Sequence, residues 1–191
     1  MCEHAINELL QTEFGYLTAI CTRPGDGRLS ITMGLANQLA LHGERVCFCS
    51  FSQGKTLNKH TPLPSVEVLP PVTDSLEPLF EQLHEVLKPH TFLFIDNLTA
   101  IVLTDGNRSL KKKAEVLSQL RDMAARCNAH VVVSDTFAHG WDGDDRYPIP
   151  REALALCDHA YIAYKESVNA DTVDDIGLPV IQLKEIARCC Q

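Results

Sequence analysis

Ile20-Cys-Thr-Arg-Pro-Gly-Asp-Gly-Arg-Leu-Ser30 is the stretch that decides the fold. It follows an apolar run, residues 16–21, that predicts a buried strand, and it leads into residues 29–41, whose apolar periodicity predicts a helix. A strand, a glycine-containing loop and a helix, in this order, are typical of a phosphate-binding loop, because loop amides and the helix N-terminus together surround phosphate oxygens. The candidate nucleotide-binding residues in this loop are Arg23, Pro24, Gly25, Asp26, Gly27, Arg28, Leu29 and Ser30.

The end of this loop departs from the usual pattern, which closes with Gly-Lys-Ser or Gly-Lys-Thr. The same positions hold Gly27, Arg28 and Leu29, so arginine replaces lysine and leucine replaces the hydroxyl that would bind magnesium. The planar guanidinium of arginine is longer and bulkier than an ammonium, so Arg28 is no simple substitute for lysine. It still suits an anion at a helix N-terminus, and we therefore expect a weak or vestigial nucleotide site.

The rest of the chain alternates between predicted strands and predicted helices. Helices are expected at 4–11, from 74 or 75 to 87, and at 110–127; strands at 45–50, 66–69, 91–96, 130–134, 160–164 and 180–184. Near-continuous apolar strands separated by helices predict a mostly parallel sheet covered on both faces. A length of 191 residues suits one such unit, so we expect a single three-layer α/β domain over residues 1–191.

Composition narrows the function classes. The net charge of −8 argues against a general nucleic-acid binder but leaves room for a local basic patch. The eight cysteines include no CxxC pair, so buried reduced thiols are favoured over a zinc site, with Cys47 and Cys49 on one side of a strand. No apolar run approaches the roughly 20 residues that span a bilayer, and no signal peptide is recognised, so a cytoplasmic protein with no membrane partner is expected.

Two carboxylates end predicted strands. Asp96 closes residues 91–96, and Asp135 follows the strand at 130–134. Carboxyl ends of parallel strands meet at one edge of a sheet, where ligands bind in this class of fold. We expect the two side chains to lie close together, as a cation site or a carboxylate dyad, with local hydrogen bonding as the alternative.

With these features in order, the chain resembles the RecA-like ATPase domain of DnaB-type replicative helicases. Residues 22–27 are similar to that family's Ala-Arg-Pro-x-x-Gly-Lys-Thr loop, residues 95–98 to its Ile-Asp-Tyr-Leu motif, and residues 158–165 to a later strand. The resemblance runs from about residue 6 to residue 188. It implies a RecA-like P-loop NTPase fold, ATP or ADP with magnesium as the ligands, and Asp96 at the magnesium site. It also implies a homo- or hetero-oligomer with another RecA-like ATPase.

The departures from the family fall on its catalytic positions. Ser52 stands where the family has a catalytic glutamate, Ser134-Asp135 replaces its Ser-Gln sensor, and Lys184-Glu-Ile186 keeps only the lysine of its Lys-x-Arg. We therefore name no catalytic residue and predict a non-hydrolysing binding or accessory module in DNA metabolism. The alternative is a divergent NTPase, coupled to single-stranded nucleic acid, that uses Arg28 and Asp96 with a lysine from a neighbouring subunit, such as Lys184.

A basic segment follows the strand that ends at Asp96. In the resembled family this region faces single-stranded DNA, so its basic residues are candidate nucleic-acid contacts: Arg108, Lys111, Lys112 and Lys113. The alternative is a solvated helix start. The acidic loop 137–146, with Trp141, suits a protein contact or a flap better than a nucleic-acid contact.

Overall fold

A seven-stranded sheet forms the centre of the computed structural model, which describes residues 7, 9–11, 13–23, 25, 27–51, 62–69, 76–104, 110–136, 138–139, 145–146, 154–165 and 181–188. Its strand order is β3-β2-β4-β5-β1-β8-β9. The strands are β1 (Leu17–Thr22), β2 (Arg45–Ser50), β3 (Val66–Leu69), β4 (Thr91–Asp96), β5 (His130–Thr136), β8 (His159–Lys165) and β9 (Ile181–Arg188). All neighbours pair in parallel except β8 and β9, which are antiparallel, so the predicted mostly parallel sheet is confirmed.

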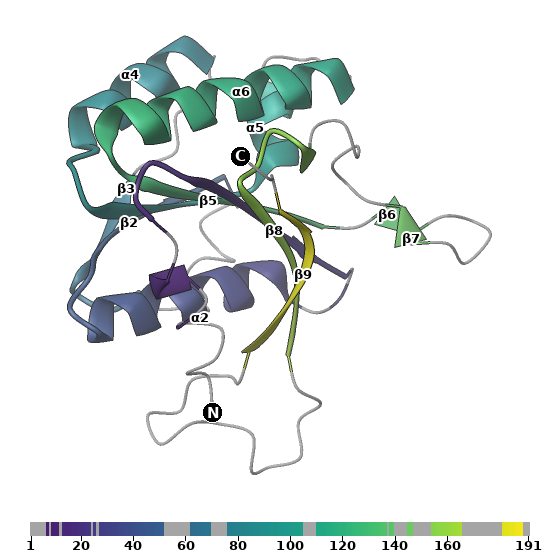
Figure 1. Ribbon diagram of the computed structural model, residues 1–191, viewed down its shortest axis with the longest axis horizontal. Coiled ribbons are helices and arrows are strands. Elements are labelled where there is room, and N and C mark those ends of the chain that lie inside the picture. The colour runs from purple at the N-terminus through teal and green to yellow at the C-terminus, as the bar shows by residue number, and fades with distance from the viewer. Residues whose placement is uncertain are drawn as a thin grey trace.

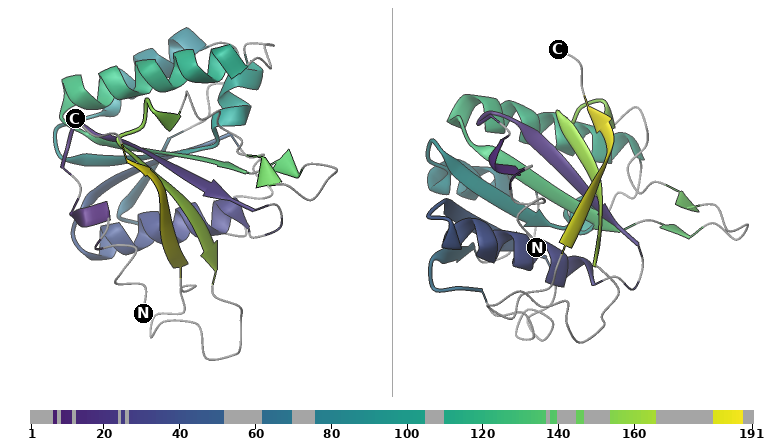
Figure 2. Two further views of the ribbon diagram at one scale, coloured as in Figure 1. Left: turned by 45° about the vertical axis from the view of Figure 1, so that its right-hand side comes forward. Right: turned by 60° about the horizontal axis from the view of Figure 1, so that its bottom comes forward.

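Helices cover both faces of the sheet, which confirms the three-layer architecture (Figures 1 and 2). Helix α2 (Arg28–Leu41) lies on one face. Helices α4 (Leu76–Val86), α5 (Leu98–Thr104) and α6 (Leu110–Cys127) lie on the other. Two short strands, β6 (Ala138–His139) and β7 (Asp145–Arg146), pair with each other beside the main sheet.

The strands supply apolar side chains to two cores. On β4, Phe92 and Phe94 pack against α2, whereas Leu93 and Ile95 pack against α4, α5 and α6. Successive side chains of a strand point to opposite faces, so a strand covered on both sides needs an unbroken apolar run. This two-sided burial explains the apolar strand patterns of the sequence.

Helix α2 begins directly after Gly27, whose φ of 75° lies in the left-handed region that glycine adopts without strain. It ends at a turn in which the His42 amide donates to the Gln38 carbonyl and the Glu44 amide to the Leu39 carbonyl. Nearly every residue between Leu29 and Ala40 is buried. The helix after the glycine loop is therefore a central element of this layer.

One described helix was missing from the expectations. Residues 98–104, expected as part of a loop, form α5. The Ala100 amide donates a 2.8 Å hydrogen bond to Asn97 Oδ1, the contact of a helix N-cap. Of the helix expected at 4–11, residues 7, 9 and 10 are helical, residue 11 lies in a turn, and the others lie outside the described residues, as does most of the loop 137–146.

The described cysteines are free thiols. Cys21, Cys47, Cys49 and Cys157 are buried and Cys127 is half-buried. Cys47 and Cys49 enter the same core, as predicted, and burial raises the pKa of Cys47 to about 11 and of Cys49 to about 12. Within the described ranges no three His, Cys, Asp or Glu side chains gather as a metal site would require, and no helix could span a membrane.

Candidate functional site at the carboxyl edge of the sheet

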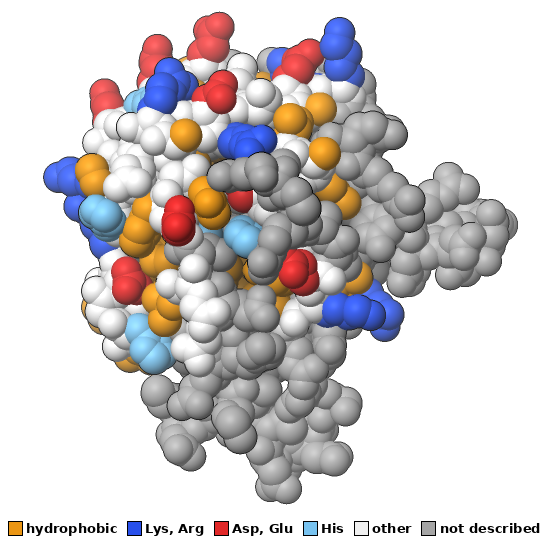
Figure 3. All heavy atoms as spheres, viewed as in Figure 1, with side chains coloured by type: hydrophobic (Ala, Val, Ile, Leu, Met, Phe, Trp, Pro, Cys, Tyr) orange, Lys and Arg blue, Asp and Glu red, His pale blue; other side chains and the backbone are white. Residues whose placement is uncertain are grey.

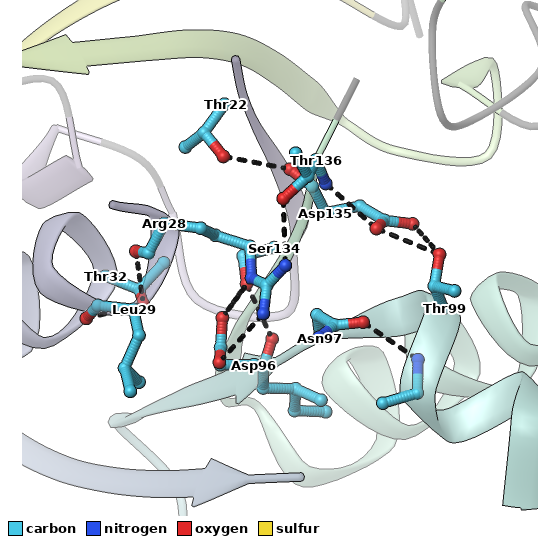
Figure 4. A network of polar contacts seen from close by, with 12 residues as sticks. Thr22, Arg28, Leu29, Thr32, Asp96, Asn97, Thr99, Ser134, Asp135 and Thr136 are labelled. Carbon is cyan, nitrogen blue, oxygen red and sulfur yellow. Dashed lines mark hydrogen bonds and ion pairs between the residues drawn. The ribbon is translucent and has the colours of Figure 1, made fainter. Parts of the chain in front are cut away.

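Strands β1, β4 and β5 end together and form the edge at which the sequence placed its candidate residues (Figure 4). In the parallel register Asp96 pairs with Ser134, and Thr22 pairs with Thr136. Both predicted carboxylates are therefore at this edge. Asp135, however, is one residue beyond the partner of Asp96, and a shift of one residue turns a side chain to the opposite face.

The expected carboxylate pair is consequently wrong. Asp96 points to the α2 face, where it contacts Arg28, and Asp135 points to the α5–α6 face, where it contacts Lys113 and Thr99. The two side chains are separated by the sheet itself. They cannot bind one cation between them or share a proton as a dyad.

Asp96 is completely buried and is bound by Arg28 from the first turn of α2. Arg28 Nε donates to Asp96 Oδ1 at 2.6 Å, and Arg28 Nη2 lies 3.5 Å from Oδ2. Arg28 Nη1 donates to Thr136 Oγ1 at 2.8 Å, and Ser134 Oγ donates to Asp96 Oδ1 at 2.8 Å (Figure 4). The guanidinium thus bridges the ends of β4 and β5, and its charge compensates the buried carboxylate.

Asp135 has a cation of its own. Lys113 Nζ, on α6, donates to Asp135 Oδ2 at 2.9 Å and to Thr99 Oγ1 at 2.8 Å. The Thr99 hydroxyl in turn donates to the carboxylate, and the Thr136 amide donates to Oδ1 at 2.9 Å. The Lys113 and Asp135 side chains are 11% and 3% exposed, so this ion pair is nearly closed to solvent.

The remaining loop residues are arranged around Arg28. Leu29 is 6% exposed and packs in the α2 core, and its side chain points away from the guanidinium (Figure 4). Gly25 has a φ of 90° and no heavy atom within 4 Å of a Cβ built on it. Arg23 is exposed and Ser30 is half-buried. Pro24, Asp26 and Ser52 lie outside the described residues.

The structure divides the basic segment. Lys113 turns inward to Asp135, whereas Lys111 is exposed and the half-buried Lys112 pairs with Glu115 at 3.6 Å. Lys112 also lines a groove of about 670 Å³ on the α4–α6 layer, together with acidic side chains of α4. Acidic and basic side chains alternate over this layer at the top of Figure 3. Arg108 lies outside the described residues, so Lys111 and Lys112 are the described part of the predicted contact that solvent reaches.

Four participants at this edge were not identified from the sequence as parts of one site. They are the hydroxyls of Ser134, Thr136 and Thr99, and the inward role of Lys113. Hydroxyl residues at strand ends were a visible signal for the first two. The orientation of Lys113 had no such signal, because a run of three lysines looks the same whether one turns inward or none does.

Comparison with known proteins gives a fold and no family. No family model matches the chain, and no curated protein matches it. A solved structure of the ATPase domain of a DnaB-like helicase is similar with a TM-score of 0.69 at 11% identity, covering 96% of this chain and 82% of that one. The fold is RecA-like. At this identity the similarity shows the fold alone, and the chemistry of this edge must be argued from its own residues.

Proposed function

We propose that this chain is a single, non-hydrolysing RecA-like domain of the DnaB type that acts as a binding or accessory module in DNA metabolism. The observation that carries the proposal is the 2.6 Å contact between Arg28 Nε and Asp96 Oδ1. In P-loop NTPases the carboxylate at this strand end serves the magnesium ion of the nucleotide, and phosphoryl transfer depends on that ion and on the loop lysine. Here an internal guanidinium occupies the carboxylate.

The neighbouring positions support the same conclusion. Leu29 offers no hydroxyl and turns into the core, and Asp135 is engaged by Lys113 and Thr99. Both carboxylates of this edge therefore have a protein partner. Loss of a single charge-stabilising group from a phosphoryl-transfer site costs orders of magnitude in rate, and an arginine finger alone is worth about 10³–10⁵-fold.

The alternative, a divergent NTPase, would need Arg28 to leave Asp96 when nucleotide binds. Lys184 on β9 is exposed, as a residue offered to a neighbouring subunit must be. Assembly with another RecA-like subunit is part of both proposals, since closed symmetric oligomers are common among soluble proteins.

Calorimetric titration with ATP and ADP, with and without magnesium, tests the proposal together with an assay of γ-phosphate release. The proposal predicts no turnover and no magnesium-dependent gain in affinity. Magnesium-dependent binding with turnover that Arg28→Ala abolishes and Arg121→Ala preserves would instead establish the divergent NTPase, because Arg121 lies at the opposite edge of the sheet.

Contact with single-stranded nucleic acid is tested separately. Lys111 and Lys112 are the described residues of the basic segment suited to phosphate contacts. A double Lys111→Ala, Lys112→Ala variant should weaken retention of a single-stranded oligonucleotide at low salt, while Lys88→Ala, a lysine control outside this segment, should not. Equal retention by the wild type and the double variant would remove the nucleic-acid role.

A further inference from the structure

The magnesium ion that the RecA-like fold implies can be tested against the residues of this chain. Magnesium requires near-octahedral oxygen ligands at close range and usually binds through a carboxylate plus waters. The carboxylate in question, Asp96, is 0% exposed, and its Oδ1 already accepts from Arg28 Nε at 2.6 Å and from Ser134 Oγ at 2.8 Å. The residues do not fit the ion.

We infer that Arg28 is a built-in replacement for the divalent cation at Asp96, so that this edge of the sheet is charge-compensated without metal. The inference deepens the proposed function and rests on it in one respect, the assignment of Asp96 to the cation position of the fold. It explains two substitutions together: the guanidinium supplies the positive charge, and Leu29 no longer has an ion to bind.

The geometry favours compensation over a chance surface pair. The guanidinium makes contacts at both ends of its fork: Nε and Nη2 approach the two Asp96 oxygens, while Nη1 donates to Thr136 Oγ1 at 2.8 Å. The Arg28 side chain is only 21% exposed. A bidentate arginine–carboxylate pair is directional and strong, and a nearby guanidinium repels a divalent cation.

The same geometry predicts what removal of Arg28 creates. Arg28→Ala would leave the Asp96 carboxylate buried without its cation and beside two hydroxyls, Ser134 Oγ and Thr136 Oγ1. These are oxygen ligands of the kind that hard cations take. A site that excludes divalent cations in the wild type should therefore bind them in this variant.

Manganese serves as the probe, measured by the loss of its free electron paramagnetic resonance signal on titration and by thermal unfolding with and without the ion. The wild type should bind no manganese at this site and show no shift in unfolding temperature. Arg28→Ala should unfold at a lower temperature and regain several degrees with millimolar manganese, because a ligand bound only to the folded state stabilises it. Arg28→Ala with Asp96→Asn should lose that gain.

Arg121→Ala is the matched control. It removes the guanidinium from another buried carboxylate, Asp158, whose other oxygen is held by the Leu17 amide. It should gain no response to manganese.

Two results would overturn the inference. One is manganese binding by the wild type that Asp96→Asn abolishes, a measurement that needs no folded Arg28 variant. The other is a folded Arg28→Ala that gains no manganese binding. Turnover by the wild type without manganese binding at Asp96 would overturn the proposed function and leave this inference standing.

Discussion

The two edges of the main sheet bury the same chemistry and organise it differently. At the amino edge, Asp158 accepts from the Leu17 amide and from Arg121 Nη2, both at 2.8 Å, so its charge joins two strands through the backbone. At the carboxyl edge, Asp96 and Asp135 are held chiefly by side chains from helices, Arg28 and Lys113. The carboxyl edge is where ligands bind in open α/β sheets.

The difference shows how a ligand edge can become self-sufficient. A pair anchored on backbone amides is part of sheet construction and would be present with or without a ligand. A pair made by a residue in the first turn of the loop helix is made possible by the residue type at one position. With lysine and a hydroxyl at positions 28 and 29 the edge would have lacked this guanidinium.

The largest expected effect concerns acid and belongs to the amino edge. Burial, with a smaller contribution from His159, lowers the pKa of His130 from its usual 6.5 to about 3, while its Nε2 lies 2.8 Å from Thr18 Oγ1 and its ring stacks on Phe92. Below about pH 6.5 the unfolded chain binds a proton that the folded protein does not. Stability should therefore fall by up to about 1.4 kcal/mol for each unit by which the pH is lowered between these two values.

Urea unfolding at pH 7, 5.5 and 4 measures this dependence. His130→Gln keeps a hydrogen-bonding group and removes the titration, so its stability should depend on pH less than that of the wild type by about one proton over this interval. Identical pH dependence of the two proteins would show that His130 is protonated in the folded state.

Removal of the guanidinium at each edge sharpens the comparison directly. Arg28→Ala should lower the free energy of unfolding by about 3 kcal/mol, because it leaves a fully buried carboxylate without its cation. Arg121→Ala should cost about 1–2 kcal/mol, since Arg121 is 33% exposed and Asp158 keeps the Leu17 amide. Denaturant unfolding without divalent ions measures both, and a larger loss for Arg121→Ala would reverse the assignment of the two edges.

Lys113 separates an internal role from a nucleic-acid role. Lys113→Met keeps the length of the side chain and removes the cation from Asp135, so a loss of about 2 kcal/mol in unfolding free energy is expected. Lys111→Met is the matched control on the exposed side of the same helix turn and should change stability by less than about 0.5 kcal/mol. Equal small effects would return Lys113 to the solvent-facing patch.

The smallest expected effect is at Thr99. Thr99→Val preserves the shape of the side chain but removes the hydroxyl that donates to Asp135 and accepts from Lys113. A loss of about 1 kcal/mol is expected, because the Lys113–Asp135 ion pair itself remains. Thr104→Val, at the other end of α5, provides the comparison variant. A neutral Thr99→Val would mean that the hydroxyl adds nothing to the pair.

Most of the fold was accessible from the sequence because it depends on local patterns. The apolar runs located the seven main strands, and the glycine loop located the start of α2. Helix α5 was missed because residues 98–104 are short and rich in β-branched side chains, although Asn97 was a visible cap. The site was predicted in composition, with Arg28, Asp96 and Asp135, but its pairing was not.

The sequence by itself determined which elements form and which residues stand at the strand ends, because strand and helix periods are properties of consecutive residues. Only the tertiary structure decided that Arg28 meets Asp96, 68 positions away, and that Asp135 meets Lys113 across the opposite face. The register of β4 against β5 and the rotation of α2 and α6 set these contacts. A charged side chain is solvated or paired according to what the fold brings within about 3 Å of it, and no local pattern encodes that distance.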